Sequence, residues 1–374
     1  MTVKNTIKRL LAIAQVAVLA LTLCVNASAA DSSYNAGTRH LQCTALSGAA
    51  EQYYADYTYR QLAEQPAAQL LTTLRMLMTG THSYQSSYAD CRDMASRTDS
   101  TGSEGSISLL YTSVTVTRAD FGGNAGTWNR EHVWPKSLGG FDNSGAGSDL
   151  HHIRPSDATV NAKRDNLKYG NVTNGATATG STLVEGASGG TYSSPYFEPL
   201  DNVKGDVARI CLYVYVRYGG ELSKCSSITT VFESVDVLLE WCELDPVDEW
   251  EMSRNDVVEE IQGNRNVFID YPEYAWLLFE REVPNEMVTP SGMAKGSAPD
   301  GDEDCAHAFG EWEENSNGER IRTCTLCGKV ERGEEGEDQP SYRSVIIVAV
   351  IVGAAGVAAG VGGVAVKRTR SRRK

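Results

Sequence analysis

The chain has 374 residues and a formal net charge of −14, which results from 48 acidic and 34 basic side chains. Its length excludes a single small domain, and its acidic balance, taken alone, argues against a nucleic-acid partner. The excess acid lies mainly in residues 233–260 and 300–338, whereas residues 118–217 hold ten acidic and ten basic side chains. Net charge therefore does not decide whether nucleic acid is a partner.

The first 30 residues have the pattern of a secretory signal peptide. Basic residues at positions 4, 8 and 9 precede an apolar run over 10–23, and Ala27-Ser28-Ala29 offers small residues for cleavage. We therefore expect residues 1–30 to direct export of the rest of the chain.

The main domain begins with residues at helical spacing. A helix that ends near Gly80 is predicted by apolar residues that fit one buried face, namely Leu70, Leu71, Leu74, Leu77 and Met78. The tyrosines at 53, 54, 57 and 59 indicate core packing. Residues 107–116 are rich in β-formers and predict a strand.

The second half of this domain is predicted to be mainly helical. Residues 170–194 consist mostly of Gly, Ser, Thr and Ala, which predicts a long exposed excursion. Residues 207–220 predict a buried helix, and two amphipathic helices follow, separated near Asp245-Pro246, with Asp245 as the cap of the second. These elements together predict an α+β fold.

Two stretches in the middle of the chain concentrate residues that carry chemistry. WNREHVWPKS (128–137) places Glu131 beside His132, and GSDLHHIRPSDATVNAKRDNLKYGNV (147–172) adds histidines, arginines and asparagines. An imidazole acts as a base near neutral pH, carboxylate and amide oxygens suit a hard cation, and arginines bind phosphate. Neighbouring side chains of a strand point to opposite faces, so Glu131 and His132 can serve one site only if a metal ion with its water lies between them. This combination suits metal-assisted hydrolysis of a phosphodiester.

These stretches resemble the bacterial endonuclease I family of secreted, non-specific nucleases, which belong to the His-Me finger (ββα-metal) group. The resemblance rests on REHVWP (130–135), DLHHIRP (149–155) and NAKRDN (161–166), with QGNRNVFIDYPEYAWLLF (262–279) as a C-terminal signature. It covers residues 53–279. It implies a His-Me finger core within a largely helical domain, in which a β-hairpin carrying His132 is crossed by a helix carrying Asn161.

The resemblance also implies roles for individual residues. His132 would be the general base, and Glu131 and Asn161 would hold one Mg²⁺ ion, or Mn²⁺ or Ca²⁺ in its place, against the scissile phosphate. Two arginines are expected among the catalytic residues: Arg154, as a phosphate contact or as an exposed charge beside a helix, and Arg164, as a partner of a phosphate or a carboxylate. The positions expected to support the site are Arg130, Asp149, His151, His152 and Asn166.

A small second module is predicted near the C-terminus. CAHAFGEWEENSNGERIRTCTLCG (305–328) has a Cys-x-His…Cys-x-x-Cys pattern, which predicts a structural Zn²⁺ site with the ligands Cys305, His307, Cys324 and Cys327. It resembles zinc-ribbon-like modules of bacterial surface proteins, and its protein partner cannot be read from the sequence. The alternative is disulfide bonding of these cysteines, which an extracellular location permits. The other cysteines allow one bridge, for example Cys43–Cys91 or Cys211–Cys225, and the sequence does not assign the pairing.

The C-terminal segment has the pattern of a membrane anchor. Residues 345–366 are uncharged, apolar and long enough to cross a bilayer, and the basic residues 367–374 favour a cytoplasmic end. The expected order is a signal peptide (1–30), an endonuclease I-like catalytic domain (31–289), a linker (290–302), a zinc-ribbon-like module (303–332), an acidic linker (333–344), a transmembrane helix (345–366) and a basic cytoplasmic tail (367–374). We therefore expect a single-pass protein of the cell surface with an extracellular catalytic domain.

The sequence thus predicts a membrane-anchored, Mg²⁺-dependent endonuclease that cuts DNA, RNA or both with little sequence specificity. A non-catalytic nucleic-acid-binding or adhesive surface protein is the alternative, which the acidic charge and the zinc-like module favour. That alternative leaves the set of Glu131, His132 and Asn161 unexplained. A metallopeptidase is disfavoured because the sequence has no His-Glu-x-x-His motif.

Overall fold

The computed structural model describes residues 41–55, 59–285, 287–294, 312–314, 320–323 and 330–332. The chain divides into two units, Met1–Ala298 and Pro299–Lys374. Three sequence predictions concern residues outside the described ones: the signal peptide (1–30), the transmembrane segment (345–366) and the zinc ligands Cys305, His307, Cys324 and Cys327. Within the described part of the chain, no helix is both long and apolar enough to span a bilayer.

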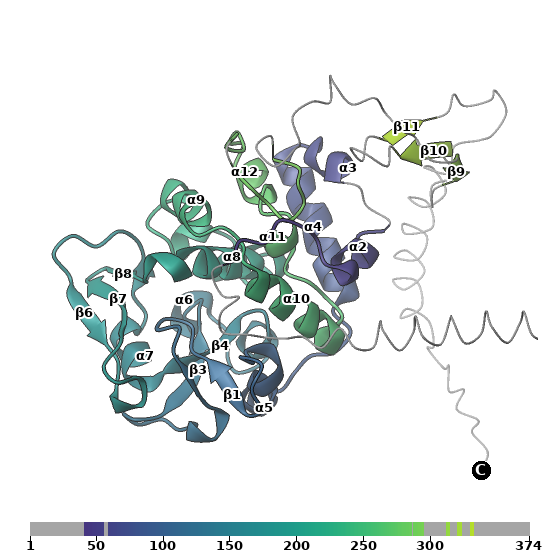
Figure 1. Cartoon of the computed structure of the whole chain (residues 1–374). Helices are drawn as coiled ribbons and strands as arrows, with labels where there is room; N and C mark the ends of the chain where they lie inside the picture. The colour runs from purple at the N-terminus through teal and green to yellow at the C-terminus, as the bar shows by residue number, and fades with distance from the viewer. Residues whose placement is uncertain are drawn as a thin grey trace, which may run out of the picture. The chain divides into compact units, whose positions relative to one another are not determined.

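Helices and strands alternate irregularly along unit 1, which confirms the expected α+β class (Figure 1). Its helices are α2 (Gly48–Tyr53), α3 (Tyr59–Ala63), α4 (Ala67–Thr81), α5 (Tyr88–Thr98), α6 (Lys136–Gly139), α7 (Ala158–Arg164), α8 (Asp201–Tyr218), α9 (Val235–Leu244), α10 (Glu249–Gln262), α11 (Val267–Asp270) and α12 (Tyr274–Leu278). Its strands are β1 (Ser106–Ser108), β2 (Thr115–Thr117), β3 (Trp128–His132), β4 (Ile153–Asp157), β5 (Lys168–Tyr169), β6 (Ala176–Thr179), β7 (Ser188–Ser193) and β8 (Tyr196–Glu198).

Helix α8 lies in the middle of the main core and is buried along nearly its whole length, because apolar residues occur on all its sides. It packs against α4 and α9. Helix α4 buries most of its predicted apolar face in the same core, namely Leu70, Leu74, Leu77 and Met78. The buried helix predicted at 207–220 and the helix predicted to end near Gly80 are therefore both confirmed.

The tyrosines near the start of the domain pack in the core, as predicted. The ring of Tyr54 lies 4.8 Å from that of Tyr271 in an edge-on arrangement, and Tyr59 stacks on Tyr274 at 5.5 Å. Tyr57 lies outside the described residues. These contacts join the N-terminal helices to the C-terminal ones.

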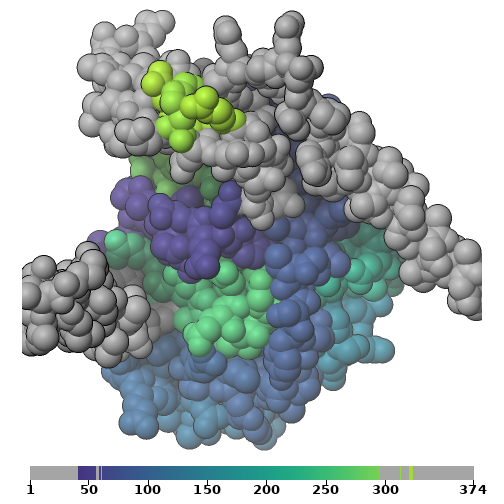
Figure 2. Space-filling view, turned by 90° about the vertical axis from the view of Figure 1, so that its right-hand side faces the viewer, coloured from purple at the N-terminus to yellow at the C-terminus, as the bar shows by residue number. Residues whose placement is uncertain are grey.

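The two predicted amphipathic helices are present as α9 and α10, but the cap of α10 differs from the prediction. Asp248, and not Asp245, accepts a hydrogen bond from the first turn of α10, whereas Asp245 accepts one from the backbone N–H of Gly205 at 2.9 Å. Figure 2 shows α2 directly above α10 on one face of the unit, and Ser47 donates a hydrogen bond to Asp256 there at 2.7 Å.

Two predictions about strands need correction. Residues 107–116 do not form one strand, because the chain turns at Ser113 (φ 55°) and pairs β1 with β2 in antiparallel register. The exposed excursion predicted at 170–194 is exposed at many positions, but it contains strands, since it supplies β6 and β7 to a four-stranded sheet of order β5-β8-β7-β6. Ala178 of β6 and Phe197 of β8 are buried side chains of this sheet. Small and polar residues form strands here because tertiary packing decides strand formation more than intrinsic preference does.

Two further observations concern the cysteines and the second unit. The five described cysteines, Cys43, Cys91, Cys211, Cys225 and Cys242, are all buried free thiols, so neither of the two candidate bridges is formed. In unit 2, β9 (Glu313–Glu314), β10 (Arg320–Thr323) and β11 (Val330–Arg332) form an antiparallel sheet of order β11-β10-β9.

Candidate active site

An antiparallel pair of strands followed by a helix forms the frame of the candidate site. Strand β3 pairs with β4 along its whole length, with His132 opposite Ile153, and α7 starts directly after β4 and packs on both strands. Asp157 joins the two elements, because it ends β4 and its Oδ1 accepts hydrogen bonds of 3.0 and 3.1 Å from backbone N–H groups in the first turn of α7. The structure thus places His132 on a strand and Asn161 on the helix that crosses it.

Alternate side chains of β3 have different surroundings. Asn129 and Glu131 contact side chains of α7, whereas Arg130 and His132 contact the ring of Tyr88 at the start of α5. This split follows from the alternation of side chains along a strand. The carboxylate and the imidazole of the central motif therefore lie on opposite faces of β3, as the sequence predicted.

His132 is held as a neutral imidazole. Its Nε2 lies 3.1 Å from the carbonyl oxygen of Gly147, and because a carbonyl only accepts, Nε2 carries the proton and Nδ1 carries the free lone pair. Burial lowers the pKa of His132 to about 3, and the neighbouring His152, Lys136 and Arg130 act in the same direction. At neutral pH the ring is therefore unprotonated at Nδ1 and able to accept a proton.

Glu131 lies on the other face in a fixed position. Its Oε1 accepts a hydrogen bond of 2.6 Å from the hydroxyl of Tyr111 and lies 3.5 Å from Nε of Arg164. Burial raises the pKa of Glu131, and the charge of Arg164 opposes that rise. Tyr111 and Arg164 together orient the carboxylate, although no sequence motif points to Tyr111, which lies twenty residues before Glu131 in the chain.

Asn161 lies beside this carboxylate-bearing face and is partly exposed. Its Nδ2 donates a hydrogen bond of 2.8 Å to Oδ1 of Asn129, so the amide oxygen of Asn161 is the atom left for another partner. A carboxylate oxygen and an amide oxygen are ligands that hard cations accept. Among the described residues there is no cluster of three or more His, Cys, Asp or Glu side chains that could hold a metal ion.

Arg154 does not occupy the exposed position that a phosphate contact or a solvated charge requires. It is 2% exposed, and its Nε lies 2.7 Å from Oδ1 of Asp99. Its guanidinium also lies 4.9 Å from the ring of Trp250, and Arg254 binds the same carboxylate. The structure therefore corrects the expectation for Arg154, because its charge is neutralised inside the domain.

Arg164 is buried as well, with a carboxylate and not a phosphate as its partner. Besides Glu131, it contacts the carbonyl oxygens of Val133 and Asp165 and stacks on the ring of Tyr169 at 4.6 Å. Of the two partners that the sequence left open, the structure shows the carboxylate. Arg164 thus positions Glu131 and the chain that follows His132.

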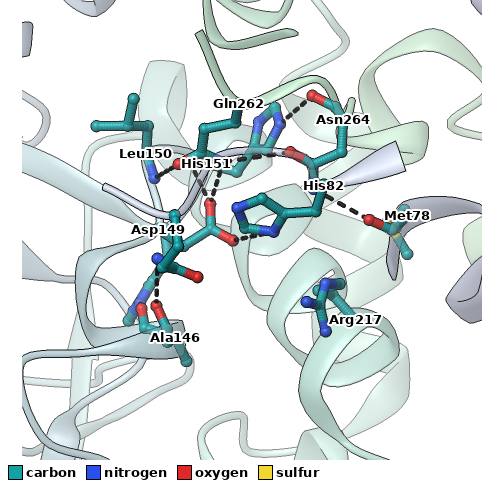
Figure 3. A network of polar contacts seen from close by, with 12 residues as sticks. Met78, His82, Ala146, Asp149, Leu150, His151, Arg217, Gln262 and Asn264 are labelled. Atoms are coloured by element: carbon teal, nitrogen blue, oxygen red, sulfur yellow. Dashed lines mark hydrogen bonds and ion pairs between the residues drawn. The ribbon is translucent and has the colours of Figure 1, made fainter. Parts of the chain in front are cut away.

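Asp149 and His151 belong to a buried polar network (Figure 3). Asp149 accepts hydrogen bonds from the backbone N–H of His151 at 2.8 Å and from Nε2 of Gln262 at 3.0 Å, and His151 donates from Nε2 to the carbonyl of Asn264 at 2.9 Å. The hydroxyls of two tyrosines on α8 also donate to Asp149, each at 2.7 Å. Both residues thus fasten the segment before β4 to the C-terminal helices.

His152 fastens the same segment to the end of β3. Its Nδ1 donates to the carbonyl of Ala146 at 2.6 Å, and its Nε2 accepts from the backbone N–H of Trp134 at 2.9 Å. Both nitrogens are therefore occupied by backbone groups. These bonds fix the turn that presents the Gly147 carbonyl to His132.

The two remaining predicted residues differ in their surroundings. Arg130 is partly exposed and its guanidinium lies 3.6 Å from the centre of the Tyr88 ring, whereas Asn166 is exposed at the turn after α7. No sequence motif indicated Tyr88, which stacks on His132 at 5.3 Å. Residues 130 and 132 of a strand point to the same face, and only this spacing could have indicated that one residue contacts both side chains.

Comparisons with known proteins identify related nucleases. The sequence profile of the family described as Endonuclease I matches residues 66–273. An extracellular ribonuclease of Bacillus subtilis (strain 168) is 40% identical over 236 residues, which are 59% of this chain and 78% of the relative. An extracellular ribonuclease of Bacillus amyloliquefaciens is 36% identical, over 58% of this chain and 76% of the relative. Endonuclease-1 of Buchnera aphidicola subsp. Acyrthosiphon pisum (strain APS) is 28% identical, over 33% and 44% of the two chains.

Proposed function

Since the chain belongs to the endonuclease I family, we propose that it is a secreted nuclease that hydrolyses phosphodiester bonds with His132 as the general base. The observation that carries this proposal is the state of His132, a neutral imidazole whose Nε2–H is fixed on the Gly147 carbonyl. The fixed bond directs the basic Nδ1 away from that carbonyl. A proton taken from the attacking water would arrive at Nδ1.

The opposite face of β3 would hold a hard cation, for which we propose Mg²⁺, with Mn²⁺ or Ca²⁺ able to use the same oxygen atoms. The donor set fits, because Glu131 offers a carboxylate that Tyr111 and Arg164 hold in place, and Asn161 offers an amide oxygen. Few protein ligands suit Mg²⁺, which keeps several waters. When bound, the cation would stabilise the charge on the scissile phosphate and on the leaving oxygen. On this basis we also propose that β3, β4 and α7 form a His-Me finger core.

A phosphate at an edge of β3 can be contacted by side chains from both faces of the strand. In the described part of the chain β3 belongs to a two-stranded sheet with β4, and on its other edge Phe121 pairs with Trp128 at the start of the strand. Glu131 and His132 leave the backbone toward opposite faces but adjoin the same edge. We therefore propose that the phosphodiester lies along this edge.

RNA is the substrate to test first, and DNA the second. The two relatives of highest identity given above carry the name extracellular ribonuclease, and a more distant one carries the name endonuclease-1. The cell-surface location through a helix at 345–366, and Zn²⁺ binding by the 303–332 module, remain proposals that rest on the sequence patterns alone.

The test is cleavage of RNA and of plasmid DNA by the wild type and by His132→Ala, with Mg²⁺ and with EDTA. Loss of a general base should reduce kcat about 10²- to 10⁴-fold, while Gln69→Ala, a control at an exposed position of α4, should leave kcat within a few-fold. Retention of activity within about tenfold in His132→Ala would contradict the assignment of the base. A wild type that binds nucleic acid and never cuts it would support the non-catalytic alternative.

A further inference from the structure

A row of alternating rings and cations leads along the surface to His132. It contains Tyr88 at the start of α5, Arg130 on β3 and Phe121 before β3, and α5 and β3 are in contact. The Arg130 guanidinium lies 3.6 Å from the centre of the Tyr88 ring and 5.2 Å from that of Phe121. Tyr88 also stacks on His132 at 5.3 Å with the rings 25° apart. The row therefore ends at the candidate base.

Two further cations extend this row. The guanidinium of Arg92 lies 5.6 Å from the Phe121 ring, and Nζ of Lys136 lies 5.9 Å from the Tyr88 ring. The side chains of Tyr88, Phe121 and Arg130 are partly exposed, and Lys136 is exposed. Arg130 and His132 project from the same face of β3, and both contact the Tyr88 ring.

Arg130 differs from the other arginines of the β3–β4 region in its charge balance. Arg154 and Arg164 are buried against Asp99 and Glu131. No carboxylate of the described residues lies within ion-pair distance of Arg130, whose Nε is buried without a hydrogen-bond partner and whose Nη1 donates to the backbone carbonyl of Tyr88. A guanidinium that is stacked and not neutralised is suited to bind a phosphate.

We propose that Phe121, Arg130, Tyr88 and Lys136 form a track for an unpaired nucleic-acid strand, with bases stacked on the two rings and phosphates bound by the two cations. This proposal rests on the proposed nuclease function and adds the structural form of the substrate. Proteins that bind single strands combine cationic grooves with aromatic rings on which bases stack. In a duplex the base faces are hidden by stacking, so they are not available to Tyr88 and Phe121. The protein should therefore prefer single-stranded substrate to duplex of the same sequence.

The experiment compares one oligonucleotide, free and annealed to its complement, as RNA and as DNA, with the full chain as enzyme. We expect kcat/KM to be about tenfold or more higher for the single strand, because stacking on one ring is worth about that factor. Phe121→Leu should raise KM for the single strand about tenfold with kcat unchanged, since Phe121 does not touch His132. Phe121→Tyr should restore KM, which separates loss of the flat ring from a folding defect.

Tyr88 provides the second pair of variants. Tyr88→Phe should bind as the wild type does, and Tyr88→Leu should bind the single strand about tenfold more weakly. Tyr196→Leu is the matched control, because Tyr196 is a partly exposed tyrosine on β8, which Figure 1 shows on the opposite side of β3 from α5. Arg130→Gln should reduce the salt dependence of binding, because one phosphate contact is removed.

Binding is measured separately, by fluorescence anisotropy of labelled single strands in EDTA, so that the two proposals fail independently. A wild type that cuts duplex and single strand equally well, or leucine variants with unchanged KM and Kd, would overturn the track and leave the nuclease assignment intact. If the wild type cuts neither substrate but binds the single strand, and Phe121→Leu and Tyr88→Leu bind it more weakly, the track is supported and the nuclease assignment is overturned.

Discussion

Replacement of Asp149 by asparagine should destabilise the chain by about 2 kcal/mol at neutral pH. The variant keeps the size and shape of the side chain and removes its charge. Asp149 is fully buried and accepts hydrogen bonds from Tyr213, Tyr218, Gln262 and the backbone of His151. An amide at this position would offer one acceptor oxygen where the carboxylate offers two, and it would set its own N–H groups against the remaining donors.

The magnitude follows from the pKa of Asp149, which is lowered from its ordinary 3.8 to about 2. Burial alone would raise this pKa, but the nearby histidines and the hydrogen bonds of Tyr213 and Gln262 outweigh it. At about 1.36 kcal/mol for each unit of pKa, the shift contributes about 2 kcal/mol of stability. Because the folded pKa is depressed, this contribution is complete well above pH 3.8 and is lost as the pH falls through about 2. At pH 3 roughly half of it remains.

The assay is urea unfolding of the wild type and Asp149→Asn at pH 7 and at pH 3, followed by circular dichroism. The difference in unfolding free energy between the two proteins should be about 2 kcal/mol at pH 7 and about half as large at pH 3. Asp120→Asn, at an exposed position, is the control and should change stability by less than about 0.5 kcal/mol. A difference for Asp149→Asn below about 0.5 kcal/mol at pH 7, or one equally large at both pH values, would refute the reasoning.

Three other predictions follow from the site. Arg154→Met should cost about 3–5 kcal/mol of stability, because it leaves the buried Asp99 without one partner. The kcat/KM of the folded variant should stay within a few-fold of the wild type, and an increase in KM alone would support the earlier expectation that Arg154 contacts a phosphate. Asn161→Ala should raise the Mg²⁺ concentration needed for half-maximal cleavage, whereas Asn166→Ala should not; equal Mg²⁺ titrations for both would place the cation elsewhere. A chain that ends at residue 298 should regain full activity after EDTA treatment with Mg²⁺ alone, because a closed zinc site has no open position; a folded but inactive truncated chain would show that the second unit completes the site.

The spacing of apolar residues predicted those helices whose buried faces are formed by residues close together in the sequence. The apolar spacing of α4 and the continuous apolar run of α8 leave little choice of structure, and both helices were predicted. The strands β6 and β7 could not be predicted, since their Thr, Ser and Gly residues become strand only when paired and packed, as at the buried Ala178. Hydrophobic periodicity carries no signal for such strands.

The site shows the same limit for side-chain roles. Glu131, His132 and Asn161 were singled out because they occur in contiguous motifs, and these motifs also predict which residues share a face of the strand. The burial of Arg154 depends on its ion pair with Asp99, which lies 55 positions earlier in a segment without a recognisable motif. A charged residue within a motif therefore says little about its exposure until its partner is known.

The links between Asp149 and Gln262, and between His151 and Asn264, each join residues 113 positions apart. A chain that is still being made or exported has the REHVWP and DLHHIRP segments long before it has these C-terminal partners. Contacts of such large sequence separation form late, after the intervening segment is complete. The turn that presents Gly147 to His132 thus lacks its anchorage until almost the whole domain is available. For an enzyme that attacks nucleic acid, this order delays the assembly of the site until residues 262–264 have been synthesised.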